Sequence, residues 1–444
     1  MLLGYLLRHL VRRGTLNVID HRGSIHRFSG EPGPTMTMRL HDPRLEWRLF
    51  FRPRLALGEA FMDGTLTIEE ASIYDFLHFM VSNVNAAPKG PLTPFYGGFG
   101  TGLRALRQYN PLPRARRNVA HHYDLSDTLY ELFLDADRQY SCAYFADPDQ
   151  TIEQAQAAKK RHIASKLVLS PGQKVLDIGC GWGGLALYLA RECGVSVTGI
   201  TLSTEQQRVA ERRAAAAGLA DRVRFELCDY RQVTDRYDRI VSVGMFEHVG
   251  VGHYRSFFRR ITELLTDDGV ALLHSIGRSD GPGNTNPWIR KYIFPGGYAP
   301  ALSEVLPVIE RLGLWVTDIE ILRLHYAETL RAWRTRFNAN RERIRALYDE
   351  RFCRMWEFYL AGSEITFRLY GHMNFQIQLA KAVDAVPRVR DYMVDWERRH
   401  RPPAPERAAR WQIEPGKGRP RPAAQPAPKE PEELPREVSR QTRQ

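Results

Sequence analysis

The sequence predicts an α/β fold, a doubly wound, Rossmann-like sheet that is preceded by a small α+β domain. From residue 174 to residue 275, apolar runs of strand length alternate with helical periods. This pattern is typical of βαβ units in a mostly parallel sheet that is covered on both faces. Before residue 52, short β-like runs are separated by glycine, proline and aspartate, which favours antiparallel strands. A chain of 444 residues is long enough for both domains and a tail.

The expected elements of the N-terminal part are short. Strands are expected at 15–19, 24–28, 35–40 and 47–51, and a helix is expected at 69–84. The segment from Pro88 to Pro113 is rich in glycine and proline, which predicts a linker or a mobile cover. We therefore place a small α+β N-terminal domain with its linker at 1–110, with lipid binding as a hypothesis for its role.

The second domain is expected at 111–400. It opens with two stretches that we interpret as amphipathic helices, at 125–134 and 151–169. Strands then follow at 174–178, 195–200, 222–227, 238–243 and 269–275, with helices at 183–193, 203–217 and 253–265. Residues 284–300 interrupt this alternation and predict a lid, and residues 303–396 predict helices with aromatic faces. The proline-rich segment 401–444 has few apolar residues, which predicts a disordered tail.

The net charge and the cysteines indicate which kind of partner the protein binds and in which compartment it is found. The formal net charge of +12 indicates an acidic partner. We expect no nucleic acid, because no zinc-finger or RNA-binding motif is present, and we favour an anionic membrane surface. Five cysteines without a CxxC pair indicate reduced thiols and a cytoplasmic location. The apolar start is interrupted at Arg8, too soon for a membrane span, so we expect peripheral association with the inner face of the membrane.

A glycine-rich loop directly follows the first strand of the second domain. The strand at 174–178 runs into glycines at 179, 181, 183 and 184. Glycines there allow the backbone to lie against a nucleoside at the carboxyl end of a parallel strand. The next strand ends in Thr201-Leu202-Ser203, without the acidic residue that a dinucleotide fold places on the ribose. The loop therefore favours S-adenosylmethionine over a nicotinamide or flavin cofactor.

Five motifs occur in a fixed order along the second domain. They are 121–126 (HHYDLS), 140–145 (YSCAYF), the glycine loop, 246–250 (FEHVG) and 292–297 (YIFPGG). With these motifs the chain resembles the cyclopropane-fatty-acyl-phospholipid synthase family, including its mycolic acid cyclopropane synthase relatives, from about residue 115 to 395. The N-terminal domain resembles that of the longer bacterial members that act on phospholipids. The resemblance implies an S-adenosylmethionine-dependent methyltransferase fold with helical acyl-binding insertions.

The resemblance also implies the reaction and its catalytic groups. The methyl group of S-adenosylmethionine is transferred to a cis double bond in an acyl chain of a membrane phospholipid, and proton loss then closes a cyclopropane ring. Family members hold a bicarbonate ion as the base. By motif matching, its ligands in this chain are Cys142, Glu247, His274 and Tyr326. No metal is implied, and a homodimer is expected from the family.

The same motifs also assign the residues of the cofactor site. The resemblance places S-adenosylmethionine against Tyr140, Ser141, Gly179, Gly181, Thr201, Leu202, Gln206 and Tyr230. One departure from the family pattern lies in a late helix, where relatives often have a cysteine and this chain has Ser363. That cysteine is not a ligand of the ion, so the difference concerns the polarity of the pocket.

Three other functions stay open at this point. The same methyl transfer without ring closure gives a methyl-branched or methylene-bearing fatty acid, and this reaction also needs a base. A methyltransferase that acts on a small oxygen or nitrogen nucleophile needs neither an acyl site nor that base. A non-catalytic lipid carrier would keep only a vestigial cofactor site, so binding of the cofactor distinguishes it from the enzymes.

Overall fold

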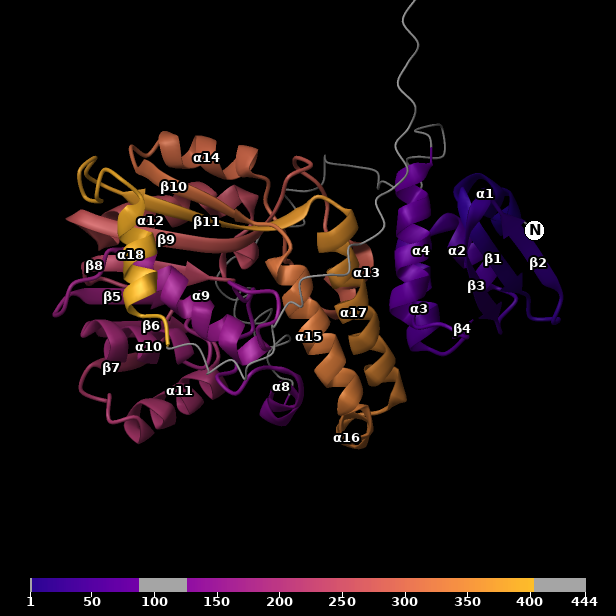
Figure 1. The fold of residues 1–444 in the computed structure, drawn as a ribbon, viewed down its shortest axis with the longest axis horizontal. Helices are drawn as coiled ribbons and strands as arrows, with labels where there is room; N and C mark the ends of the chain where they lie inside the picture. The colour runs from indigo at the N-terminus through magenta and orange to yellow at the C-terminus, as the bar shows by residue number, and fades with distance from the viewer. Residues whose placement is uncertain (1, 88–125, 403–444) are drawn as a thin grey trace, which may run out of the picture. The chain divides into compact units, whose positions relative to one another are not determined.

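A computed structural model describes residues 2–87 and 126–402, and the described residues up to 401 belong to one compact unit. The expected linker at 88–113, the histidines of the 121–126 motif and the expected tail beyond 402 lie outside the described residues. Within the described part the chain forms two β-sheets, one of four strands and one of seven (Figure 1).

The four-stranded sheet belongs to the N-terminal part and has the strand order β2-β1-β3-β4. Its elements are α1 (Leu2–Leu10), β1 (Arg13–Ile19), β2 (Ile25–Ser29), β3 (Glu31–Leu40), α2 (Leu45–Phe51), α3 (Pro53–Met62), β4 (Leu66–Glu69) and α4 (Ile73–Ala86). The expectation of antiparallel strands throughout was wrong, because β1 and β3 are parallel. Only Gly30 separates β2 from β3, and the chain crosses there to the other side of β1. A Cβ atom on Gly30 would lie 2.1 Å from the carbonyl oxygen of Arg12, so the crossing requires glycine.

The expected strand at 47–51 is part of helix α2. Leu45 and Leu49 are buried, whereas Trp47 and Phe51 are more than half exposed. Both pairs are four residues apart, which is the spacing of one helix face. The helical burial pattern therefore overrides the β preference of the aromatic residues.

The seven-stranded sheet has the order β10-β11-β9-β8-β5-β6-β7. Its strands are β5 (Lys174–Ile178), β6 (Ser196–Thr201), β7 (Val223–Leu227), β8 (Tyr237–Val243), β9 (Leu265–Arg278), β10 (Trp315–Leu322) and β11 (His372–Ala380). The five strands β7, β6, β5, β8 and β9 are parallel, and β11 and β10 extend the sheet in antiparallel pairing. This confirms the doubly wound α/β fold.

Helices cover both faces of this sheet and gather beyond one of its edges. They are α8 (Asp127–Phe133), α9 (Ile152–Leu167), α10 (Gly184–Cys193), α11 (Thr204–Ala216), α12 (Tyr254–Leu264), α13 (Pro287–Tyr292), α14 (Leu302–Glu310), α15 (His325–Ala339), α16 (Arg341–Leu347), α17 (Glu350–Leu369) and α18 (Asp391–Arg399). One apolar cluster joins α12 and α14 to the sheet, and another joins α9 and α10 to it. A third, strongly aromatic cluster joins α8, α15 and α17.

Two expectations for the second domain were wrong in part. Residues 303–396 contain strands β10 and β11 in addition to helices. In β11 the apolar residues face the cluster under α12 and α14, while Asn374, Gln376 and Gln378 are buried. Helix α9 is present but is not amphipathic, because its polar residues Lys159, His162 and Lys166 are buried as well.

Candidate functional site

A cavity of about 160 Å³ lies at the carboxyl ends of β5, β6 and β8. In an open α/β sheet this is the edge where ligands bind. Its lining includes all eight residues that the sequence assigns to the cofactor: Tyr140, Ser141, Gly179, Gly181, Thr201, Leu202, Gln206 and Tyr230. The fold therefore brings four separate stretches of the chain together around one space.

The glycine loop forms the floor of the cavity. Gly179 and Gly181 have φ angles of 85° and 54°, which side-chain-bearing residues rarely adopt. A Cβ atom on Gly179 would also lie 2.9 Å from Cβ of Met245, another lining residue. The sharp turn and the close approach of two backbone segments both depend on glycine here.

The start of α11 fixes the side of the cavity next to β6. Ser203 caps the helix, since its Oγ accepts a hydrogen bond from the backbone N–H of Gln206 at 3.3 Å. The hydroxyl of Thr201 donates to Oε1 of Gln206 at 2.8 Å, and both side chains are buried. Gln206 itself lines the cavity, and an amide NH₂ group is a donor suited to a polar ligand.

Tyr230 provides an aromatic wall. Its ring packs edge-on against Phe257 with centroids 5.3 Å apart, and the guanidinium of Arg231 lies 5.5 Å from the ring centroid. Arg231 is held in place by two hydrogen bonds to Asp229, at 2.7 and 2.8 Å. Burial raises the pKa of the Tyr230 hydroxyl to about 12, so the residue stays neutral. Such a wall suits a flat, apolar group such as a nucleobase.

Tyr140 and Ser141 form another part of the cavity lining. The Tyr140 ring stacks on Trp333 with centroids 5.2 Å apart, and its hydroxyl lies 2.9 Å from that of Tyr359. The Ser141 hydroxyl accepts a hydrogen bond from Nζ of Lys159 at 2.9 Å. Tyr140 therefore separates the cavity from the aromatic cluster of α8, α15 and α17.

The sequence reasoning assigned no role to the charged residues of the lining, which are Arg138, Lys159, Asp177, Asp229 and Arg231. Lys159 and Asp177 are the most deeply buried of them, each at most 2% exposed. Burial lowers the pKa of Lys159 to about 8 and raises that of Asp177 to about 7. An acidic residue in an apolar strand just before the glycine loop was a usable signal for Asp177. Nothing in the helical stretch around Lys159 distinguishes it from its neighbours.

The four candidate catalytic residues lie outside the cavity lining. Cys142 and Tyr326 belong to the aromatic cluster, in which the Tyr326 ring packs against Trp333 and Phe367. The Cys142 thiol donates to the carbonyl of Ala143 at 3.3 Å. Burial raises the pKa of this thiol, so it remains protonated and neutral.

Glu247 lies in the turn that follows β8, within a short 3₁₀-helix at Phe246–His248. Its Oε1 accepts a hydrogen bond from the backbone N–H of Ile276 at 2.6 Å. Its Oε2 is buried and has no hydrogen-bond partner among the described residues. Burial raises the pKa of the carboxyl group to about 7. This leaves one acceptor oxygen open in a dry environment.

His274 lies on β9, two residues before Ile276 and on the same face of the strand. Nδ1 is 3.1 Å from the amide nitrogen of Gln376, and Nε2 is 3.3 Å from that of Asn374. Burial lowers the pKa of His274 to about 3, so the ring is neutral and has a single N–H. One of the two amides must therefore present its oxygen, and both ring nitrogens are engaged.

The structure brings the four catalytic candidates only partly together. Glu247 and His274 share one end of β9 through Ile276, and Cys142 and Tyr326 share the aromatic cluster. In the described part of the chain, no hydrogen bond joins Cys142, Glu247 and His274 to one another.

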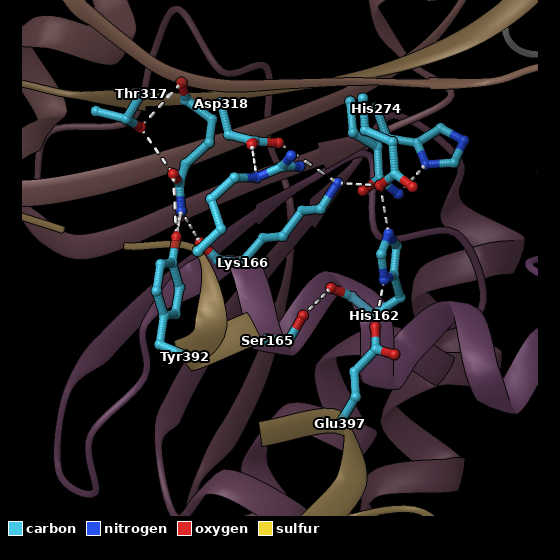
Figure 2. A network of polar contacts seen from close by, with 12 residues as sticks. His162, Ser165, Lys166, His274, Thr317, Asp318, Tyr392 and Glu397 are labelled. Atoms are coloured by element: carbon cyan, nitrogen blue, oxygen red, sulfur yellow. Dashed lines mark hydrogen bonds and ion pairs between the residues drawn. The ribbon is translucent and has the colours of Figure 1, made fainter. Parts of the chain in front are cut away.

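A network of buried polar residues lies next to His274 (Figure 2). Strand register places Glu320, Gln376 and His274 side by side on β10, β11 and β9. His162 of α9 sits between two carboxylates, with Nε2 2.6 Å from Glu320 and Nδ1 hydrogen-bonded to Glu397 of α18. Burial opposes a charge on His162, but the two carboxylates outweigh burial and raise its pKa. An imidazolium thus joins α9, β10 and α18.

Comparison with known proteins relates this arrangement to a family. Residues 111–377 match the family model described as mycolic acid cyclopropane synthetase. The chain is 38% identical over 349 residues to cyclopropane-fatty-acyl-phospholipid synthase of Escherichia coli K12, covering 78% of this chain and 88% of that protein. It is 43% identical over 386 residues to tuberculostearic acid methyltransferase UfaA1 of Mycobacterium tuberculosis, covering 82% and 87%. The solved structure of mycolic acid cyclopropane synthase CmaA1 complexed with SAH and CTAB matches with a TM-score of 0.57 and 35% identity, covering 61% and 99%.

Proposed function

This chain belongs to the mycolic acid cyclopropane synthetase family, and from that premise we propose that it cyclopropanates unsaturated phospholipids. The methyl group of S-adenosylmethionine is transferred to the cis double bond of an acyl chain, and loss of a proton closes the ring. The observation that carries the proposal is the single cavity lined by all eight cofactor candidates. A related protein, CmaA1, has been solved with SAH, which supports the same cofactor class here.

The aromatic cluster beside Tyr140 supports an acyl substrate. An alkene is a weak, neutral nucleophile, so it must be aligned with the sulfonium methyl in a site without water. Trp333 and Tyr359 contact Tyr140, and Phe294 packs against Tyr359. Aromatic faces stabilise a carbocation without forming a bond to it. Methyl transfer at this boundary therefore places the developing cation next to rings.

A base must accept the proton that ring closure releases. Glu247 fits a bicarbonate ion, because its buried Oε2 has no partner among the described residues and would accept a hydrogen bond from the ion's hydroxyl. His274 joins such a site only by exchanging an amide partner for the ion. Cys142 and Tyr326 provide neutral donors. Bound there, bicarbonate supplies a proton acceptor within an apolar site.

Methyl transfer without ring closure is the second candidate function. It is favoured by the 43% identity to a protein named tuberculostearic acid methyltransferase, which exceeds the 38% identity to the synthase of Escherichia coli. Both reactions use the same cofactor, acyl substrate and base, so the fate of the cation distinguishes them.

An exposed aromatic and basic face on helix α2 supports peripheral binding to an anionic membrane. Trp47 and Phe51 are 56% and 60% exposed, and their rings stack with centroids 6.0 Å apart. Arg44, Arg48 and Arg52 lie within or next to the same helix. Aromatic rings enter the lipid interface while arginines meet anionic headgroups. Among the described residues, no helix combines the length and the apolar character that crossing a bilayer requires.

The same proposal extends to the domain organisation. We place membrane binding in the N-terminal domain at 1–110, methyl transfer in the domain at 111–400, and no catalytic role in the tail at 401–444. The inner face of the membrane is the surface that provides both the anionic charge and the acyl substrate.

Transfer of a labelled methyl group tests the proposal. The purified protein is incubated with methyl-labelled S-adenosylmethionine and vesicles of unsaturated or fully saturated phospholipids with identical headgroups. Label is expected in the lipid fraction of the unsaturated vesicles alone. Label in neither fraction would contradict the proposal and favour a small-molecule methyltransferase. Failure to bind S-adenosylhomocysteine as well would favour a lipid carrier.

A further inference from the structure

We propose that Arg54, together with Arg278, binds the phosphate group of the phospholipid whose acyl chain enters the aromatic cluster of α8, α15 and α17. The inference rests on the proposed function, because it names a headgroup contact of the same lipid substrate. Neither arginine belongs to the residues that the sequence motifs assign to the cofactor or to the base.

The edge of the aromatic cluster becomes polar where three elements reach it. Each of α3, β9 and α17 packs an apolar residue against the cluster and has a polar residue within three positions of it. The pairs are Leu55 and Arg54 on α3, Ile276 and Arg278 on β9, and Phe367 and Tyr370 at the end of α17. An apolar interior with a few polar groups at its edge suits an acyl chain that has a charged headgroup.

Strand β9 connects this polar edge with the proposed base. His274, Ile276 and Arg278 lie two residues apart and therefore on the same face of the strand. The backbone N–H of Ile276 donates to Oε1 of Glu247 at 2.6 Å. Four residues of a strand span roughly 13 Å, so Arg278 lies that far from His274 along β9. A lipid whose phosphate binds at the edge thus directs its acyl chain toward Glu247.

Arg54 is a partly buried cation without an acidic partner among the described residues. Glu59, the acidic residue of the same helix, pairs with cations of α2 and α13 instead. Tyr370 and Arg278 are the groups that act on Arg54 electrostatically, and neither is an anion. Burial lowers the pKa of Arg54, but a guanidinium keeps its proton at any physiological pH. An incoming anion is therefore favoured at this place.

The start of helix α3 adds positive charge at the same point. The first turn of α3 has no acidic residue, and no side chain caps it. The positive end of the helix dipole is thus uncompensated beside Arg54, which lies in that turn.

Arg278 provides further donors but little net charge. Its Nε and Nη2 donate to the two carboxylate oxygens of Asp280, at 2.8 and 2.7 Å. A guanidinium has five N–H donors, so this pair occupies only part of them. Because Asp280 offsets the charge of Arg278, the net charge of the site is that of Arg54. One positive charge matches the one negative charge of a phosphodiester, and arginine binds phosphate oxygens in bidentate geometry.

Kinetics with two lipids that have the same acyl chains test the inference. An unsaturated phosphatidylglycerol and the matching diacylglycerol are presented in micelles of a neutral detergent, which removes the effect of an anionic surface. In Arg54→Gln the ratio of kcat/KM for the phospholipid to that for the diacylglycerol is expected to fall roughly 10-fold, mainly through KM. Arg311→Gln removes the same charge from the exposed end of α14 and should keep the wild-type ratio.

Calorimetry gives a second measurement that does not need turnover. The ligands are a short-chain phosphatidylglycerol, below the concentration at which it forms micelles, and inorganic phosphate. In Arg54→Gln the affinity for the short-chain lipid is expected to fall roughly 10-fold. If the wild type binds inorganic phosphate as tightly as this lipid, the site is one for free phosphate, and the assignment to a lipid is overturned.

The outcomes separate the inference from the proposed function. No methyl transfer to either lipid, with lipid binding that still depends on Arg54, contradicts the proposed function alone. Methyl transfer with an unchanged ratio in Arg54→Gln overturns the inference alone, and so does unchanged binding of the short-chain lipid. Equal losses for the two lipids mean that Arg54 supports the packing of α3, which also overturns it. Thermal unfolding checks each variant, and Arg54→Met replaces Arg54→Gln if the latter does not fold.

Discussion

Glu247 has a carboxyl group that is buried. One of its oxygens accepts a hydrogen bond from the backbone of Ile276, and the other is buried without a partner among the described residues. Burial raises its pKa to about 7. A group with a pKa near the working pH exchanges protons with little cost, which is the property that acid–base catalysis needs.

Replacing the Glu247 carboxylate tests this role. Glu247→Gln keeps the shape and the hydrogen bond from Ile276 but replaces the carboxylate that would hold the bicarbonate base with a neutral amide. Turnover is expected to fall roughly 100- to 10,000-fold. Binding of S-adenosylhomocysteine should change less than about 2-fold, because Glu247 does not line the cavity. Equal losses of turnover and of binding would show that the residue supports the fold instead.

The raised pKa of Glu247 also predicts how stability depends on pH. The protonated form is favoured in the folded state, so this contribution is fully present below pH 4.5 and is lost as the pH rises through about 7. Between pH 5 and pH 8 the free energy of unfolding of the wild type should fall about 2.5 kcal/mol relative to Glu247→Gln. Urea unfolding at several pH values measures this. A constant difference between the two proteins would contradict the assigned pKa.

Helix α18 shows how an element is held by charge as well as by packing. Its Glu397 binds His162 of α9, whose ring also stacks on Tyr144 with centroids 4.1 Å apart. On the same helix, Trp396 packs against the apolar cluster of α9 and α10. The helix thereby closes the polar layer that lies next to His274 (Figure 2).

Removal of one carboxylate tests the contact between α18 and α9. Glu397→Gln is expected to lower the free energy of unfolding by about 1–2 kcal/mol at pH 6, because the imidazolium of His162 loses one of two anionic partners. The pKa of His162 is raised, so its contribution is present below pH 6.5 and is lost as the pH rises through the folded value. The effect should therefore be smaller at pH 9. Glu263→Gln, at an exposed pair with Arg260, is the control and should change stability little.

Some helices and strands could be predicted from the sequence, and others could not. The strands and helices from 174 to 264 follow the prediction closely, because apolar strands and helical periods alternate there without interruption. Strand β11 was missed although Asn374, Gln376 and Gln378 alternate with apolar residues, since both faces are buried and the alternation does not separate a wet face from a dry one. The expected strand at 47–51 failed because aromatic β preference was weighted above the four-residue spacing of Leu45 and Leu49.

Some residues of the candidate site could also be predicted from the sequence, and others could not. The cofactor lining was predictable, because a glycine loop and strand ends bring distant residues to one edge of the sheet. Cys142, Glu247, His274 and Tyr326 came from family resemblance rather than from spacing. Lys159 was not predictable, because its burial results from tertiary packing of α9 against the sheet.

At the scale of the whole molecule, the positive charge and the exposed face of α2 predict reversible membrane binding. Binding to vesicles with anionic lipids should weaken as salt is added, because the Debye length shortens from about 10 Å at 0.1 M to about 3 Å at 1 M. The double substitution Trp47→Ser and Phe51→Ser should weaken it further. Cosedimentation with vesicles measures both effects.

A matched control tests whether vesicle binding depends on the aromatic residues of α2 or on any exposed apolar residue. Val383 and Val389 are 64% and 61% exposed in another part of the chain. Replacing both valines with serine should leave vesicle binding unchanged. If the valine and aromatic variants bind equally well, α2 is not the membrane-binding face.

Analysis of the lipid product tests the central claim most directly. Lipids from cells that express the protein are examined by mass spectrometry for a gain of one CH₂ unit on unsaturated acyl chains, and by NMR for the strained ring. Cyclopropane protons on those chains are the predicted result. The same gain in mass with a branched methyl or a methylene group, and no ring signal, would contradict ring closure by this protein.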